Sequence, residues 1–171
     1  MNMVTPTTSA SFQPNSENTR MLRDAFGRFA TGVTVVTAPS SDGPVGITAN
    51  SFSSVSLDPA LVLWSPAKES NRFKYFTEAQ HFAIHVLAAD QQDICMGFVK
   101  DAFALKDVPH HFNEHNVPLI DGCLARFECS LANVVDAGDH AVVLGQVLQA
   151  ELRDGVPLTF FGGSFGSFSA F

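Results

Sequence analysis

Apolar residues recur every three or four positions near the start of the chain, between residues 19 and 31. This spacing places them on one face of an amphipathic helix. Asn18 or Thr19 precedes the pattern as the expected N-terminal cap, and Gly32 follows it as the expected stop. The pattern therefore predicts a first helix, whose apolar positions are Met21, Leu22, Ala25, Phe26, Phe29 and Ala30.

Short apolar or β-branched runs separated by turn residues occupy most of the remaining chain. Such runs predict strands, and the turn chemistry of residues 39–44 joins the first two as an antiparallel hairpin. The predicted strands cover residues 33–38, 45 onward, 61–64, 81–88, 124–135, 141–152 and 158–161. Helical patterns follow Ser70 and Asp90, each of which is the expected N-terminal cap, and residues 100–116 have the composition of a loop. The predicted fold class is mainly β with short helices, arranged as a small antiparallel barrel.

Residues 46–56 break the alternation expected of a half-buried strand. Polar side chains would fall on alternate positions there, because successive side chains of a strand point to opposite faces. Instead Thr48 and Asn50 lie on one parity, whereas Ser51 and Ser53 lie on the other. Two interpretations stay open at this point: both faces of an edge strand meet water, or some of these groups bind an anionic ligand.

Residues 68–72 form a second candidate anion site. Ser70 has the position of a helix cap, and the start of a helix offers free backbone N–H groups. Lys68 and Arg72 add positive charge beside it. A solvated basic turn is the competing interpretation.

The composition indicates a globular protein with a sizeable core. Of 171 residues, 46% are hydrophobic and 16% charged, which predicts a single domain over residues 19–171. A net charge of −7 argues against a nucleic-acid partner, and no apolar run reaches the roughly 20 residues that span a membrane. Residues 1–18 are polar and lack signal-peptide features, which predicts a disordered tail and a cytoplasmic protein. The three cysteines have no paired spacing and are expected to be reduced, small core residues.

The histidines do not form a recognisable metal motif. His81 and His85 have the spacing of a helical metal pair but fall in a predicted strand, so packing or polar roles are expected. The group of His110, His111 and His115 lacks companion thiolates, and no metal site is predicted there. Hydrolytic catalysis has no support either. Residues 162–166 (GGSFG) have the GxSxG spacing, but only five residues follow them, so the helix of a nucleophile elbow cannot start there.

The tripeptide Gly138-Asp139-His140 lies between two predicted strands, where the imidazole would be exposed on a turn. Taken by itself, this segment is an ordinary turn in which Asp139 caps its own backbone.

Five segments that follow one another along the chain are together more specific for one protein family than any one of them is alone. They are residues 29–37 (FATGVTVVT), 46–56 (GITANSFSSVS) with Asp58-Pro59 behind it, 82–87, 138–140 (GDH) and 157–163 (PLTFFGG). Together they resemble the short-chain flavin reductases, the FMN-binding split-barrel family that includes the reductase components of two-component monooxygenases. The resemblance covers about residues 20–165.

This resemblance implies a homodimer of six-stranded antiparallel Greek-key split barrels, with flavin in a groove near the subunit interface. FMN or FAD would be the cofactor, and NADH or NADPH the hydride donor. The residues implied along the isoalloxazine ring and ribityl chain are Thr48, Ala49, Asn50 and Ser51. Those implied at the phosphate end are Ser53, Ser70 and Arg72. His140 would lie near the site of hydride transfer and help to seat the nicotinamide.

The function that the resemblance implies is NAD(P)H-dependent flavin reduction in support of a partner monooxygenase. Direct hydride transfer needs orientation rather than a strong general base, which agrees with the lack of a recognisable Ser-His-acid triad. A non-catalytic flavin-binding or electron-carrier protein is the alternative on the same barrel, and oxidation of a small substrate, as in pyridoxamine-phosphate-oxidase-like relatives, is a third. Two residues depart from the family pattern, and their roles stay open: Arg72 stands where Thr is frequent, and His85 where Asn is frequent.

Overall fold

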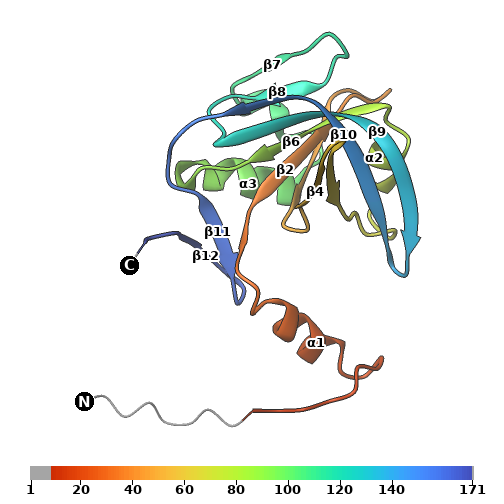
Figure 1. The fold of residues 1–171 in the computed structure, drawn as a ribbon, viewed down its shortest axis with the longest axis vertical. Coiled ribbons are helices and arrows are strands. Elements are labelled where there is room, and N and C mark those ends of the chain that lie inside the picture. Colours follow the sequence, from red (N-terminus) through yellow and green to blue (C-terminus); the bar gives the residue numbers. More distant parts are fainter. Residues whose placement is uncertain (1–8, 171) are drawn as a thin grey trace.

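A computed structural model describes residues 9–170, which form mainly antiparallel β-structure with a few short helices (Figure 1). The main sheet has the strand order β3-β2-β6-β9-β10-β5-β4. The bounds are Thr34–Ala38 (β2), Val45–Ala49 (β3), Ser53–Leu57 (β4), Ala60–Trp64 (β5), His81–Val86 (β6), Ala125–Ala137 (β9) and His140–Leu152 (β10). The mainly β class is confirmed, but this sheet has seven strands rather than six. The stretch at 46–56 accounts for part of the difference, because it contributes two strands, β3 and β4.

The two edges of the main sheet lie close together in sequence. β3 and β4 are its outer strands, and only residues 50–52 separate them. In a flat sheet of seven strands the edges would be about 29 Å apart, at a spacing of about 4.8 Å between neighbours. Four residue steps reach at most about 14 Å. The sheet is therefore strongly curled, and residues 50–52 mark the place where its edges approach.

Two apolar clusters stabilise this sheet. In the first, the fully buried rings of Trp64 and Phe76 meet edge to face at a centroid distance of 5.2 Å. The second includes Phe98 of helix α3 (Gln92–Lys100). Every residue of β2 is buried, and its alternate side chains enter the two clusters, as the geometry of a central strand requires.

Helix α1 (Thr19–Phe26) projects away from the main sheet (Figure 1). It leads into a three-stranded sheet in the order β1-β11-β12, with bounds Thr31–Gly32 (β1), Leu158–Phe161 (β11) and Ser164–Ser167 (β12). No residue of α1 is buried, and Phe26 is 68% exposed. The helix ends five residues before the predicted residue 31, because Gly27 caps it and accepts a hydrogen bond from the Gly162 N–H.

Several predicted boundaries are wrong by a few residues. Helix α2 (Phe73–Thr77) begins after Ser70, whose hydroxyl instead accepts the Arg72 N–H at 3.2 Å within the preceding turn. Asp90 does not cap α3, because it lies inside the 3-10 turn η1 (Ala89–Gln91). The segment predicted as loop contains a second 3-10 turn and a small hairpin, with bounds Ala104–Asp107 (η2), His110–Phe112 (β7) and Pro118–Ile120 (β8).

The predicted N-terminal tail can be compared only in part. Residues 1–8 lie outside the described residues, and residues 9–18 contain no helix or strand. None of the helices in the described chain has the length and apolarity needed to cross a membrane.

Candidate functional site

An apolar groove of about 370 Å³ opens where the end of β3 meets helix α3 and the β11–β12 hairpin. We refer to it as the apolar groove. Its lining residues are Val33, Thr48, Ala49, Asn50, Met96, Val99, Phe160 and Phe165. Phe160 and Phe165 face one another with centroids 5.1 Å apart and planes tilted by 60°. The groove thus presents aromatic, thioether and aliphatic walls with a polar edge from β3.

A second groove, of about 500 Å³, lies next to the first; we refer to it as the polar groove. It is lined by Ile47, Thr48, Glu69, Ser70, Asn71, Arg72, Phe98 and Val99. Thr48 and Val99 belong to both grooves, so the two grooves are adjacent. The structure therefore brings together five of the residues that the resemblance singles out: Thr48, Ala49, Asn50, Ser70 and Arg72.

Main-chain groups of Thr48 also face the grooves. β3 is an edge strand that pairs only with β2 within the main sheet. The Gly46 N–H points away from β2, because it donates to the Ala102 carbonyl at 2.8 Å. Backbone groups two residues apart on a strand point to the same side, so the N–H and C=O of Thr48 point away from β2 as well. The Thr48 hydroxyl donates to the Cys95 carbonyl at 2.7 Å, which leaves its oxygen only as an acceptor.

Arg72 is held by main-chain carbonyls at the end of α3. Its Nη1 donates to the carbonyl oxygens of Phe98 and, at 3.4 Å, Gly46, and its Nη2 donates to that of Val99 at 3.4 Å. Carbonyls at a helix C-terminus carry partial negative charge, so the guanidinium is well placed there. Burial lowers the pKa of Arg72 below its ordinary value, and the nearby charge of Asp101 opposes that shift. The guanidinium remains charged at any physiological pH.

Ser51 and Ser53 line neither groove. The Ser51 hydroxyl accepts the Ser65 N–H at 2.9 Å and so connects the end of β5 to the corner between β3 and β4. Ser53 is exposed, and its hydroxyl donates to the Ser54 carbonyl at 3.1 Å. Both hydroxyls are thus engaged with the backbone of this corner.

His140 begins β10, directly after the tight turn at Gly138, whose φ of 69° favours glycine. Its Nδ1 lies 2.8 Å from an Asp139 carboxylate oxygen, and its side chain is 44% exposed. The hydrogen bond and charge of His140 lower the pKa of Asp139. His140 lines neither groove. The segment that carries Ser70 and Arg72 nevertheless touches this turn, through an antiparallel bridge between Ala67 and His140.

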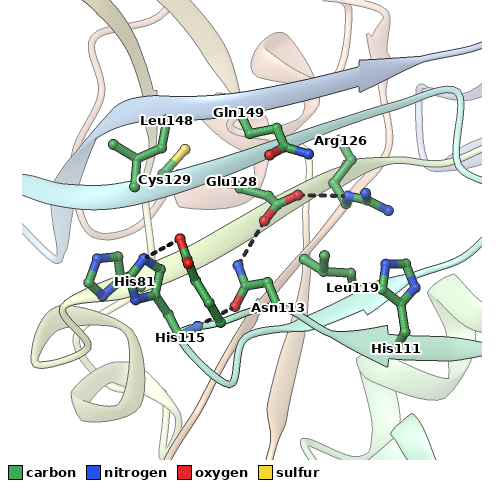
Figure 2. Close-up of a pocket in the computed structure, with 11 residues that line it drawn as sticks. His81, His111, Asn113, His115, Leu119, Arg126, Glu128, Cys129, Leu148 and Gln149 are labelled. Carbon is green, nitrogen blue, oxygen red and sulfur yellow. Dashed lines mark hydrogen bonds and ion pairs between the residues drawn. The ribbon is translucent and has the colours of Figure 1, made fainter.

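A third cavity, of about 460 Å³, lies between the β7–β8 hairpin and strands β9 and β10 (Figure 2). The imidazoles of His81 and His115 stack there, with centroids 3.7 Å apart and planes inclined by 6°. Glu128 accepts a hydrogen bond from Asn113 at 2.7 Å and lies 3.5 Å from the Arg126 Nε. None of the residues that the resemblance singles out lines this cavity. Among the described residues, no group of three histidine, cysteine or acidic side chains is arranged to hold a metal ion.

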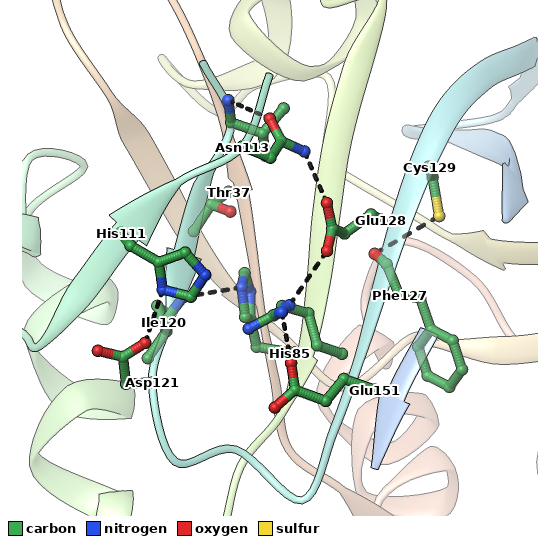
Figure 3. Close-up of polar contacts among 12 residues, drawn as sticks. Thr37, His85, His111, Asn113, Ile120, Asp121, Phe127, Glu128, Cys129 and Glu151 are labelled. Carbon is green, nitrogen blue, oxygen red and sulfur yellow. Dashed lines mark hydrogen bonds and ion pairs between the residues drawn. The ribbon is translucent and has the colours of Figure 1, made fainter. Parts of the chain in front are cut away.

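His85 lies beside this network and has a structural role (Figure 3). Its Nδ1 donates to the Val35 carbonyl at 3.0 Å, and its Nε2 accepts the Ile120 N–H at 3.1 Å. Both nitrogens of a neutral ring are therefore satisfied, and complete burial lowers the pKa of His85 to about 3. The ring connects β6 and β2 to β8, which confirms the expected packing or polar role.

Comparison with known proteins identifies the family of this chain. Residues 26–169 match the flavin reductase like domain. The chain belongs to the flavin reductase family. This flavin reductase is 56% identical over 158 residues to the FMN reductase (NADH) SmoA of Agrobacterium fabrum, with coverage of 92% of this chain and 91% of SmoA. It is 53% identical over 132 residues to the reductase component of the flavin-dependent trigonelline monooxygenase of Acinetobacter baylyi, and this match covers 75% of this chain but 42% of that protein.

A solved structure supports the same family at the level of the fold. The NADH:FAD oxidoreductase SgcE6 of Streptomyces globisporus superposes with a TM-score of 0.86 at 35% identity, over 94% of this chain and 98% of that chain. SgcE6 has also been solved in complex with NAD and FAD fragments, and that structure matches with a TM-score of 0.85 at 36% identity, over 93% of this chain and 98% of that chain. Homologues of this flavin reductase are thus NADH-dependent flavin reductases and reductase components of monooxygenases.

Sequence reasoning missed one wall of the candidate site. Met96 and Val99 fall in a predicted helix, and Phe160 and Phe165 lie near the C-terminus, where no binding residue is predicted. The signal was present in the unusual number of phenylalanines, 16 in the chain, but composition does not tell a groove wall from a core residue.

Proposed function

We propose that this protein is an NADH-dependent flavin reductase that binds FMN along the two grooves and supplies reduced FMN to a partner monooxygenase. The observation that carries the proposal is that the apolar and polar grooves adjoin one another and share Thr48 and Val99. FMN likewise has an apolar end and a polar end, since its flat aromatic ring is joined through a polar chain to a phosphate. FAD in place of FMN, and NADPH in place of NADH, are the alternatives within this proposal.

The apolar groove suits a flavin ring chemically. Phe160 and Phe165 offer aromatic surface, and Met96 a polarizable thioether, both of which pack favourably on flat rings. The polar edge of such a ring needs hydrogen-bond partners, and the outward N–H and C=O groups of Thr48 meet that need. Ala49 and Asn50 extend this edge toward the corner where β3 ends. Ser51 would contribute through its main chain, because its hydroxyl is engaged with Ser65.

The polar groove suits a phosphate. Arg72 has three guanidinium hydrogen bonds, all to carbonyls, and no carboxylate lies within ion-pair distance of it in the described chain. Its charge is therefore available to a dianion, with the Ser70 hydroxyl and the Asn71 side chain on the same wall. Ser53 would lie at the far rim of this end, because it is exposed and outside the groove lining.

His140 would seat the nicotinamide. With Nδ1 engaged by Asp139, Nε2 is left to hydrogen-bond the carboxamide of the nicotinamide. Bound flavin supplies the chemistry by accepting a hydride directly from the nicotinamide. The task of the protein is then to orient two planar groups, for which no strong base is needed.

The choice of cofactor and partner follows from the relatives. SmoA, a relative that matches over most of both chains, is named for FMN and NADH, so FMN and NADH are the preferred pair. Another relative is the reductase component of a monooxygenase, which supports an oxygenase as the acceptor of reduced flavin. FAD is the alternative because SgcE6 is an NADH:FAD oxidoreductase.

A homodimer of cytoplasmic split barrels completes the proposal. The curled main sheet, whose edge strands β3 and β4 are joined by residues 50–52, supports a Greek-key split barrel. The apolar side chains of α1, exposed in a single chain, support a second copy as their partner. Free Cys95, Cys123 and Cys129 support a reducing compartment.

The proposal is tested by measuring NADH oxidation with the purified protein at increasing FMN. We expect saturable turnover that depends on FMN, and a rate reduced by at least about tenfold in His140→Ala. A non-catalytic flavin carrier, the alternative, would bind FMN with the same affinity in both proteins but would oxidise NADH slowly in both. Failure to bind any flavin would contradict the proposal as a whole.

A further inference from the structure

Lys68 lies between the turn that carries His140 and the segment that carries Ser70 and Arg72. Its ammonium group donates to an Asp136 carboxylate oxygen at 2.7 Å and to the Gly138 carbonyl at 2.6 Å. Asp136 lies near the end of β9, and Gly138 lies in the tight turn between β9 and β10. The hydrogen bond and charge of Lys68 also lower the pKa of Asp136.

The backbone around Lys68 contacts the same turn. The Lys68 N–H donates to the Asp139 carbonyl at 2.9 Å, and the Ala141 N–H donates to the Pro66 carbonyl at 3.1 Å. With the bridge between Ala67 and His140, residues 66–68 act as a short extra strand beside the start of β10.

The same segment continues directly into the polar groove. The Ser70 N–H donates to the Ala67 carbonyl at 3.1 Å, which closes one turn, and the Phe73 N–H donates to the Ser70 carbonyl at 2.9 Å, which closes the next. Lys68 is thus two residues from Ser70 and four from Arg72 along a chain of consecutive tight turns. A displacement of the 138–140 turn therefore changes the separation between the two ends of the proposed site.

We propose that Lys68 is a positioning residue for hydride transfer, which holds the turn bearing His140 in register with the phosphate-binding segment. The inference rests on the proposed function. An exposed ion pair between one lysine and one carboxylate has little effect on stability. Lys68 differs because its side chain is only 34% exposed and because it also binds a main-chain carbonyl inside the turn. Its effect is therefore expected on the geometry of His140 more than on folding.

A double-mutant cycle tests this role with Lys68→Met, His140→Ala and the double variant. If Lys68 acts through His140, Lys68→Met lowers kcat/KM for NADH by about tenfold in the wild-type background and by less than about twofold in His140→Ala. The Kd for FMN stays within about twofold of wild type in Lys68→Met, because Ser70 and Arg72 are retained. Lys106→Met is the matched control, since Lys106 is exposed and lines neither groove.

A readout independent of turnover separates this inference from the proposed function. The imidazole NMR signals of His140 should shift or broaden in Lys68→Met and remain unchanged in Lys106→Met. Additive losses in the cycle, or unchanged His140 signals, would overturn the role of Lys68 even if the enzyme is active. A wild-type protein without NADH-dependent flavin reduction would instead overturn the proposed function, whatever the NMR result. If Lys68→Met does not fold, Asp136→Asn, which removes one partner of the ammonium group, must change the same signals to a smaller degree; no change would overturn the inference.

Discussion

A Cβ atom at Gly46 in β3 would lie 2.3 Å from Cε1 of Phe98, a fully buried residue of helix α3. We therefore expect Gly46→Ala to displace α3, and to lower the free energy of unfolding by about 1–3 kcal/mol. FMN affinity should fall with it, because α3 supplies one wall of both grooves. Chemical denaturation and FMN titration measure the two effects. Gly32→Ala is the matched control, because its Cβ meets nothing within 4 Å, and a similar loss there would contradict this account.

Arg72→Met should reduce the contribution of the phosphate to flavin binding. The charge of Arg72 is the one that the polar groove offers to a dianion, and charge-assisted hydrogen bonds are worth about 1.5–3 kcal/mol. We expect the Kd for FMN to rise at least about tenfold while the Kd for riboflavin, which lacks the phosphate, changes by less than about threefold. Fluorescence titration of both ligands gives this ratio. Equal losses for FMN and riboflavin would mean that Arg72 only fixes α3 to β3. Lys106→Met controls for the change of net charge.

Ser51→Ala should affect folding more than flavin binding. The substitution leaves the Ser65 N–H without its 2.9 Å acceptor. An unsatisfied, partly buried donor costs about 1–3 kcal/mol. The Kd for FMN is expected to stay within about twofold, because the main chain of Ser51 is retained. Thermal unfolding and FMN titration check both statements; unchanged stability with a large loss of affinity would give the hydroxyl a direct role in binding.

His85 makes the protein less stable as the pH falls below neutrality. Burial lowers the pKa of His85 to about 3 in the folded protein, whereas the unfolded chain has the ordinary value near 6.5. Between these values the unfolded state takes up a proton that the folded state does not, so the contribution to stability is present above pH 6.5 and is lost as the pH falls toward 3. From pH 7 to pH 5 the free energy of unfolding should fall by about 2 kcal/mol from this group alone.

The variant His85→Asn isolates this effect, because an amide can donate to the Val35 carbonyl but does not titrate. Urea unfolding should show that the free energy of unfolding falls less between pH 7 and pH 5 in the variant than in the wild type. An equal pH dependence in the two proteins would show that His85 is not the titrating group.

Much of the fold could be predicted from the sequence, because its strands are short apolar runs bounded by turns. β2, β5 and β6 are recognisable in this way, and so is the long β9–β10 hairpin. The extent of α1 could not be predicted, because its apolar spacing continues past Phe26 and only the backbone contact between Gly27 and Gly162 shows where it stops. The apolar pattern did not separate β3 from β4, because the corner at residues 50–52 has no glycine or proline to mark it.

The candidate site was predictable where the residues are close in sequence and unpredictable where it depends on packing. Thr48, Ala49 and Asn50 come from one polar stretch, and Ser70 and Arg72 from another. Their meeting at α3 follows from the Arg72 contacts with carbonyls, which depend on tertiary structure alone. The role of Lys68 is of the same kind, because its partners lie 68 and 70 residues away.

The most direct test of the central claim is the visible spectrum of the FMN-loaded protein when NADH is added without oxygen. We predict that the absorption band of the bound flavin bleaches within the time of one catalytic turnover, and that His140→Ala bleaches at least about tenfold more slowly with the same FMN loaded. A protein whose bound flavin keeps its colour in excess NADH would contradict the account.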